Sequence, residues 1–142
     1  MSNTEQVLVL VKPDGVERGL VGQVLARAEA RGYKIARLEL RQATPELLAA
    51  HYAEHRDKPF YPSLVEYMTS GPVVALVLEG AQVITAFRTM AGATDPIKAA
   101  PGTIRGDFAR DWGAGDIKNI VHASDSPESA AREIAIWFPA AA

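Results

Sequence analysis

Two continuous apolar runs constrain the fold of this chain more than any other feature. Val7–Val11 and Val73–Leu78 contain only apolar residues. Each has the length of a strand and falls far short of the roughly 18 residues needed to cross a bilayer. A strand that is apolar at every position is suited to burial on both of its faces. The two runs therefore predict central strands of a sheet, and no membrane-spanning helix is expected.

Helical and strand periodicity alternate along the rest of the chain. Apolar residues recur at helical spacing from Leu20 to Ala28, and Gly32 ends this predicted helix. Tyr33–Leu40 alternates polar and apolar residues, with a slip at Ala36, and predicts a second strand. Further helices are expected from Thr44 to about His55, over Tyr61–Thr69, over Ala81–Met90 and after a cap at Ser126, and a last strand over Asn119–His122.

The order of these elements is βαββαβ with added helices. This order predicts an α+β, ferredoxin-like sandwich, in which helices lie on one face of an antiparallel four-stranded sheet. Ala91 to about Lys118 is rich in glycine and shows little periodicity. A loop of this length inside a compact domain is usually either functional or disordered.

Length and composition limit the class of protein. With 142 residues, the chain is expected to form a single domain over 1–142. A net charge of −2 gives no indication of nucleic-acid binding, which normally requires a basic surface. The absence of cysteine excludes disulfides and thiolate metal sites. The first residues lack the basic and apolar regions of a signal peptide, so a cytoplasmic location is expected.

The segment from Asn119 to Ser126 carries the clearest chemical signal. His122 ends a short apolar run, and a helix start follows directly. The free N–H groups of a helix N-terminus attract anions. A histidine held beside them can act as a nucleophile toward a phosphoryl group. A structural or surface role remains the alternative for a histidine taken alone.

Several motifs together resemble the nucleoside diphosphate kinase family. The segment Asn119–Ser126 resembles the active-site signature of that family. The other matching segments follow in order and at family spacing over nearly the whole chain: Lys12–Gly15, Arg18–Gly22, His51–Tyr52, Lys58–Phe60, Ser70–Val73, Pro101–Phe108 and Glu128–Ala130. The resemblance implies an enzyme that transfers a γ-phosphoryl group between nucleotides by a ping-pong mechanism. It also implies little selectivity for the base or the sugar.

The resemblance also implies roles for individual residues. His122 would form a phosphohistidine, Glu133 would hold the other ring nitrogen, and Ser124 would brace the same corner by hydrogen bonding. Alone, Glu133 would be read as a solvated helix residue. Lys12 and Tyr52 complete the expected catalytic set. Lys12 also belongs to the expected nucleotide-binding set, with Phe60, Arg88, Thr94, Arg105, Asn119 and His55.

These nucleotide contacts have distinct chemistry. Arg88 and Arg105 can hold phosphate oxygens bidentately. Phe60 is expected to stack on the base, and an ordinary core phenylalanine is the alternative. Mg²⁺ would be bound mainly through substrate phosphates, so no metal-binding residue is named. The expected partners are nucleoside triphosphates and diphosphates, and a homo-oligomer, either a tetramer or a hexamer, is implied.

Two departures from the family pattern bear on the site. Ala123 stands where glycine is usual, and its methyl group is tolerable only if its φ angle is negative. The segment from Ala109 to Lys118 is longer than the common form, and either Trp112 or Ile117 could face the base. A non-catalytic nucleotide-sensing module of the same fold is the main alternative function. A serine hydrolase ranks lower, because the sequence lacks the G-x-S-x-G motif.

Overall fold

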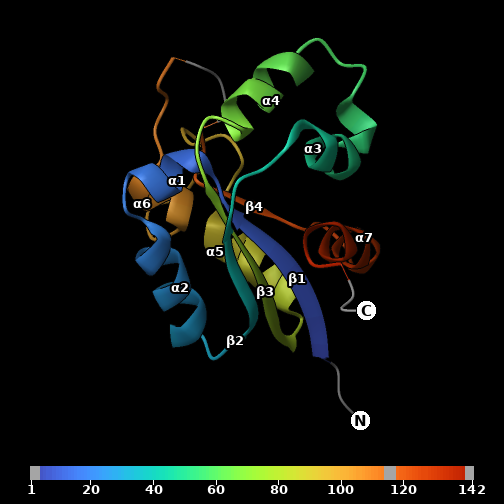
Figure 1. The fold of residues 1–142 in the computed structure, drawn as a ribbon. Helices are drawn as coiled ribbons and strands as arrows, with labels where there is room; N and C mark the ends of the chain where they lie inside the picture. Colours follow the sequence, from blue (N-terminus) through green and yellow to red (C-terminus); the bar gives the residue numbers. More distant parts are fainter. Residues whose placement is uncertain (1–3, 114–117, 140–142) are drawn as a thin grey trace.

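A computed structural model describes residues 4–113 and 118–139 of the chain. Figure 1 shows the path of the chain from β1 to α7. The elements are β1 (Thr4–Val11), α1 (Pro13–Glu17), α2 (Val21–Ala30), β2 (Lys34–Arg41), α3 (Pro45–His51), the 3₁₀ helix η1 (Ala53–His55), α4 (Tyr61–Met68), β3 (Val73–Ala81), α5 (Val83–Ala91), α6 (Ile104–Phe108), β4 (Val121–Ala123) and α7 (Pro127–Trp137). The strands form one antiparallel sheet in the order β2-β3-β1-β4. The predicted α+β, ferredoxin-like class is confirmed.

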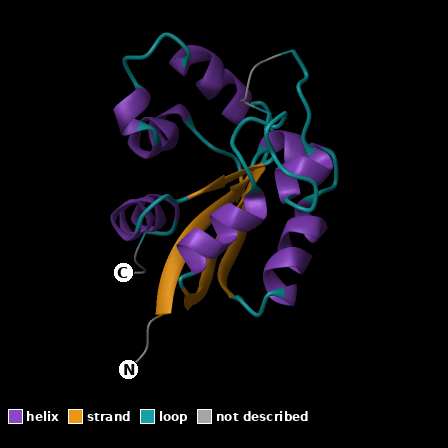
Figure 2. Cartoon of the chain, turned by 180° about the vertical axis from the view of Figure 1, so that it is seen from behind, coloured by secondary structure: helices purple, strands orange, loops and turns teal. Residues whose placement is uncertain are grey.

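Helices cover both faces of this sheet, so the expectation that they lie on one face is wrong. Along β1, Val7, Val9 and Val11 pack into one buried cluster with α2 and α5. Leu8 and Leu10 point the other way and pack with α3, α4 and α7. These two groups of helices flank the sheet in both views (Figure 1, Figure 2). The physical reason is the alternation of side chains along a strand: an uninterrupted apolar run needs cover on both faces.

The second strand lies at the edge of the sheet. It pairs with β3, and its register shifts between Ile35 and Arg37, where the sequence pattern slips at Ala36. The side chains of Leu38 and Leu40 are 49% and 68% exposed. The alternation in this segment therefore predicts the strand correctly, although these two leucines contribute little to the core.

Periodicity predicted neither of two short helices, α1 and α6. Each has only five residues, which is too short for a helical repeat to be visible. Helix α6 lies inside the segment expected to be a loop, and the hydroxyl of Thr103 caps it by accepting a hydrogen bond from the Gly106 amide. Helix α3 also ends at His51, before the expected limit near His55. Among the described residues, no helix is long and apolar enough to cross a membrane.

Candidate active site

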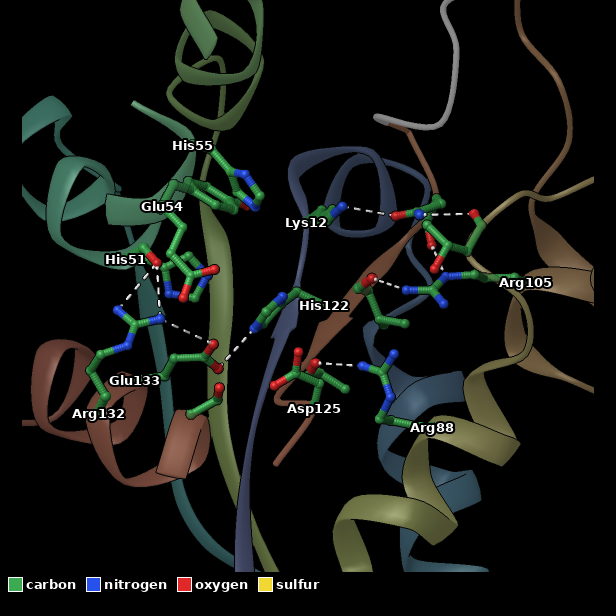
Figure 3. Close-up of a pocket in the computed structure, with 16 residues that line it drawn as sticks. Lys12, His51, Glu54, His55, Arg88, Arg105, His122, Asp125, Arg132 and Glu133 are labelled. Carbon is green, nitrogen blue, oxygen red and sulfur yellow. Dashed lines mark hydrogen bonds and ion pairs between the residues drawn. The ribbon is translucent and has the colours of Figure 1, made fainter. Parts of the chain in front are cut away.

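A pocket lies over β4, with α3 and α7 on one side and α5 and α6 on the other (Figure 3). Nine of the eleven predicted site residues line it, namely Lys12, Tyr52, His55, Arg88, Thr94, Arg105, Asn119, His122 and Glu133. Ser124 and Phe60 do not line it. Ser124 is fully buried beneath the pocket, and Phe60 lies 46% exposed at its margin. The structure thus gathers residues from both ends of the chain into one site.

His122 is the middle residue of β4 and lies opposite Leu10 of β1. Because side chains alternate along a strand, Val121 and Ala123 face the α5 side while His122 faces α7. Its Nε2 atom lies 2.9 Å from Oε1 of Glu133, the residue that the sequence places eleven positions later. The short strand and the following helix therefore bring the histidine and the carboxylate together.

Glu133 is held in turn by a buried serine. The hydroxyl of Ser124 donates to Oε1 of Glu133 at 2.8 Å and accepts a hydrogen bond from the backbone amide of Leu8 at 3.0 Å. The side chain of Glu133 is only 7% exposed. The serine and the carboxylate therefore occupy fixed positions relative to β1.

This arrangement selects one tautomer of the His122 ring. An ionised carboxylate can only accept, so the Nε2 atom of His122 must carry a hydrogen toward Glu133. In the neutral ring, the lone pair is then on Nδ1. A histidine oriented in this way is suited to nucleophilic attack through Nδ1, and its carboxylate partner can stabilise the positive charge that develops.

His51 is a neighbour of His122 to which the sequence analysis gave no role of its own. The two rings meet edge to face, with their centroids 4.6 Å apart. The indole N–H of Trp137 donates to Nδ1 of His51 at 3.0 Å. Burial first, and then the charges of His122, Arg132, Lys12 and His55, lower the pKa of His51 to about 2. It is therefore neutral at physiological pH. The three-residue spacing from Leu48, also buried on α3, was the available signal that it faces inward.

His51, His122 and Glu133 are the one group of potential metal ligands found among the described residues, with ligand atoms within 4.8 Å of one another. The hydrogen bond from Trp137 argues against a metal there. The indole N–H can only donate, so it requires an acceptor at Nδ1 of His51 and places the ring hydrogen on Nε2. A metal bound at Nδ1 of His51 would displace the indole hydrogen of Trp137, and a metal bound at Nε2 would displace the ring hydrogen. The cluster therefore serves better as a support for the His122 ring.

The opposite side of the pocket is formed by Lys12, Arg88, Arg105 and Asn119, which we call the cationic wall. Nζ of Lys12 donates to Oδ1 of Asn119 at 2.8 Å. The amide nitrogen of Asn119 donates to the backbone carbonyl of Thr94 at 3.1 Å. Lys12 and Asn119 are 9% and 2% exposed. Their side chains are therefore ordered by hydrogen bonds and by burial.

The two arginines of the wall are anchored to different extents. Arg88 donates to the carbonyl of Ala123 at 3.0 Å. Arg105 donates to three carbonyls, those of Asn119 at 3.2 Å, Gly92 at 2.8 Å and Val121 at 2.6 Å. A guanidinium group has five N–H donors, so two remain in Arg105 for a ligand. Burial, followed by the charge of Arg88, lowers the pKa of Arg105 to about 10, and it is still a cation at neutral pH.

Aromatic side chains lie along the third side of the pocket: Tyr52 and His55 line it, and Phe60 lies at its margin beside His55. We call these three residues the aromatic rim. The rings of Tyr52 and His55 lie 6.2 Å apart, and those of His55 and Phe60 lie 5.6 Å apart. Burial, and then the charge of Glu133, raise the pKa of Tyr52, so its hydroxyl stays protonated. The rim therefore offers ring faces and edges in place of fixed charge.

The structure answers one question raised by the unusual residues and part of another. Ala123 lies within β4 and is not among the described residues with positive φ, so its methyl group is accommodated. Trp112 is 45% exposed beside the guanidinium groups of Arg18 and Arg110, and it does not line the pocket. Ile117, the other candidate for the base, lies outside the described residues.

Three charged pocket residues were not predicted as site residues: Glu54, Asp125 and Arg132. Arg132 precedes Glu133 on α7 and donates to the backbone carbonyl of Ala50 at 3.0 Å. This contact connects α7 to the end of α3. Adjacency to Glu133 was the available signal for Arg132. Asp125 was interpreted only as part of the turn after β4.

Comparisons with known proteins agree with this geometry. A family model described as "Nucleoside diphosphate kinase" matches residues 5–142. A protein of that name from Nocardia farcinica is 66% identical over 137 residues, covering 96% of each chain. Another, from Rhodococcus erythropolis, is 61% identical over 138 residues, again covering 96% of each chain. The structure of a halophilic nucleoside diphosphate kinase from Halobacterium salinarum in complex with CDP superposes with a TM-score of 0.88 at 47% identity, covering 95% of this chain and 88% of that one.

Proposed function

The chain belongs to the nucleoside diphosphate kinase family, and we propose that it transfers the γ-phosphoryl group of a nucleoside triphosphate to a nucleoside diphosphate through a phosphohistidine on His122. The observation that carries this proposal is the 2.9 Å contact between Nε2 of His122 and Glu133, at a pocket whose opposite wall is cationic. A nucleophile and a phosphate-binding surface thus face the same space.

The proposed reaction has two half-reactions. In the first, Nδ1 of His122 attacks the γ-phosphorus, a P–N bond forms, and the bond between phosphorus and the bridging oxygen breaks. The nucleoside diphosphate then leaves. In the second, a terminal oxygen of another nucleoside diphosphate attacks the phosphohistidine, and the P–N bond breaks. Glu133 stabilises the charged ring throughout, because it keeps the hydrogen on Nε2.

The cationic wall supplies the electrostatic part of catalysis. Transfer of a phosphoryl group depends mainly on alignment and on neutralising charge on the phosphate oxygens. Lys12, Arg88 and Arg105 provide this charge, while Asn119 and Thr94 fix the wall beside the phosphates. Tyr52 and Ser124 complete the proposed catalytic set, with Tyr52 as a hydrogen-bond donor toward phosphate and Ser124 as the support of Glu133.

The aromatic rim supports the proposed base site. Phe60 presents an exposed ring beside His55, as expected of a group that stacks on a base. Stacking on an aromatic ring tolerates every base, since each base has a π-face. This accounts for the proposed lack of selectivity between purine and pyrimidine nucleotides.

Mg²⁺ is proposed as the cofactor, bound mainly through the phosphates. The donor set of the pocket fits this mode of binding. Four cations line the pocket, namely Lys12, Arg88, Arg105 and Arg132. Among the described residues, Glu54 and Asp125 are the carboxylates on its lining besides Glu133. These two carboxylates can accept hydrogen bonds from water on the ion. When bound, Mg²⁺ neutralises phosphate charge.

We also propose that residues 1–142 act as one domain in the cytoplasm, without a membrane or nucleic-acid partner. Assembly into a tetramer or hexamer is proposed as well. The exposed Leu38 and Leu40 on the edge strand β2 support association with other copies. The mass in solution, measured by light scattering, would distinguish the two assemblies.

The test of the proposed activity is a single-turnover experiment with γ-labelled ATP and Mg²⁺, followed by unlabelled GDP or CDP. An acid-labile, alkali-stable label should appear on the protein and then move to the added diphosphate. His122→Ala should take up no label and still bind nucleotide. His55→Ala is the matched control, since it alters a pocket histidine without removing the nucleophile, and it should still be labelled. Nucleotide binding by the wild type without any label would favour the sensing module.

A further inference from the structure

The backbone is strained at Ile120, two residues before His122. Its φ angle is +75°, and its β-branched side chain is fully buried. The amide of Val121 donates to the carbonyl of Asn119 at 2.8 Å, so residues 119–121 form a γ-turn with a left-handed central residue. This form of the γ-turn is rare, and a positive φ is costly for a β-branched residue. Some interaction must therefore hold the turn in place.

The carboxylate of Asp14 supplies that interaction. Its Oδ2 atom accepts a hydrogen bond from the Ile120 amide at 3.1 Å, and the carboxylate comes from α1, more than a hundred residues earlier in the chain. The Ile120 carbonyl accepts from the amide of Lys12 at 2.7 Å. Both backbone polar groups of Ile120 are thus bound by residues at the start of α1. Close approach is possible because Gly15 has no side chain; a Cβ atom there would lie 3.3 Å from the Ile120 carbonyl oxygen.

Asp14 is itself fixed by a second partner. The hydroxyl of Tyr67 on α4 donates to its Oδ1 atom, while the backbone amide of Asp14 donates to the same hydroxyl at 3.0 Å. Asp14 is only 9% exposed. The carboxylate therefore has a partner on each oxygen and connects α4 to the γ-turn.

The γ-turn presents its flanking carbonyls to Arg105. Nε of Arg105 donates to the carbonyl of Asn119, and Nη2 donates to that of Val121. In an extended strand these carbonyls would be about 7 Å apart along the chain. The turn shortens the segment, so one guanidinium group contacts both. The same turn places Asn119 where its side chain meets Lys12 and the carbonyl of Thr94.

We propose that Asp14 is a positioning residue, which holds the strained γ-turn at Ile120 and thereby places Arg105 and Asn119 for phosphate binding. This inference rests on the proposed kinase function. Asp14 lies behind the pocket lining, so it acts through the turn and makes no contact with substrate. The strained conformation of Ile120 thus fixes the positions of Arg105 and Asn119 in the cationic wall.

The first test compares Asp14→Ala with Asp14→Asn. Alanine removes the acceptor for the Ile120 amide, so the phosphorylation rate of His122 should fall roughly 10-fold or more through misplacement of Arg105. Asparagine keeps an acceptor of the same shape and can still donate to the Tyr67 hydroxyl, so most of the rate should be retained. Val24→Ala is the matched stability control, because Val24 is fully buried in α2, away from the pocket. It should lower the melting temperature with little loss of rate.

A double-mutant cycle with Arg105→Ala separates positioning from general destabilisation. Once Arg105 is absent, Asp14→Ala should cost less than about 3-fold in rate, because Asn119 is then the only one of the two positioned groups that can still be misplaced. If the rate loss of the double mutant equals the product of the two single losses, the proposal is overturned. The proposal would also be overturned if Asp14→Ala and Val24→Ala lost the same rate after losing the same free energy of unfolding.

Ile120→Gly provides a second route if Asp14→Ala folds poorly. Glycine adopts a positive φ without a steric penalty. In the Ile120→Gly background, Asp14→Ala should therefore cost much less rate than it does when Ile120 is present. Both proteins compared in this background contain the cavity left by isoleucine, so its effect on the rate cancels. An undiminished loss would contradict the proposal. Labelling of the wild type is measured in parallel, so failure of the kinase function itself would be recognised separately.

Discussion

The cationic wall and the aromatic rim face the same pocket but are built in different ways. Arg105 on the wall donates to three backbone carbonyls, and Lys12 and Asn119 hold each other while buried. On the rim, Phe60 is 46% exposed, and the buried Nδ1 atom of His55 lacks a hydrogen-bond partner within the described structure. Polar groups are thus fixed on one side and less constrained on the other.

This difference matches the demands of the proposed reaction. Stabilising charge on a transferring phosphoryl group requires donors that are already oriented, since reorienting them during the reaction would cost free energy. Accepting several bases requires a surface without fixed donors or acceptors. The comparison therefore predicts that changes to the arginines of the wall reduce the rate, while a change to Phe60 on the rim reduces affinity.

The largest effect is expected from the two arginines of the wall. Arg88→Ala and Arg105→Ala should each lower the rate of phosphoryl transfer roughly 100-fold or more. Only Arg105→Ala should also lower the free energy of unfolding substantially, by about 1–3 kcal/mol, because it leaves buried carbonyls without a donor. Transfer kinetics and urea unfolding of both variants check this. If both variants lost the same free energy of unfolding, the additional carbonyl contacts of Arg105 would contribute nothing to stability.

A smaller effect is expected at the side of the pocket that carries His51. Its pKa is about 2 in the folded protein and about 6.5 when unfolded. The unfolded chain therefore binds a proton between these values that the folded protein does not. The contribution of neutral His51 to the free energy of unfolding is complete above pH 6.5. It should be lost at up to about 1.4 kcal/mol per pH unit as the pH falls below that value.

Urea unfolding between pH 7 and pH 4.5 measures this loss. His51→Gln is the control, because its side-chain oxygen can still accept from the Trp137 indole, and it does not titrate. The groups that face His51 are His122 on β4, Arg132 on α7, Lys12 after β1 and His55 in η1. The His51→Gln variant should lose less free energy of unfolding on acidification than the wild type does. The same pH dependence in both proteins would mean that His51 is not the group responsible.

The smallest effect is expected on the rim. Phe60→Ala should weaken nucleotide binding by about 1 kcal/mol, the lower end of the stacking range, because a half-exposed stacking surface is lost. Its side chain is already half exposed, so the melting temperature should change little. Titration with ADP, GDP and CDP measures both the loss and its dependence on the base. A large loss for one base only would show that the rim selects among bases.

Sequence reasoning succeeded where one local pattern determined the outcome. The apolar run of β1 predicted a buried central strand, and the slip at Ala36 coincides with the irregular register of β2. Glu133 was singled out only because the chain resembles a known family. Nothing in its local pattern distinguishes it from a solvated glutamate on a helix.

The site residues without a predicted role depend on contacts between distant segments. His51 is defined by Trp137, which lies 86 positions away, and Asp14 by Ile120, 106 positions away. The strain at Ile120 was unexpected, since isoleucine is a residue that normally avoids a positive φ. The sequence instead raises the question of the φ angle at Ala123, where the backbone is ordinary strand.

Local sequence patterns specify the buried strands and most of the longer helices, and the family resemblance identifies most of the residues that meet in the pocket. These features depend on side-chain periodicity and on motifs that remain intact in a linear chain. Three features become visible only in the folded molecule: helices cover both faces of the sheet, Trp137 sets the tautomer of His51, and the Asp14 carboxylate binds the turn beside His122. Each of these depends on hydrogen bonds or packing between residues far apart in the chain, and such contacts have no local pattern.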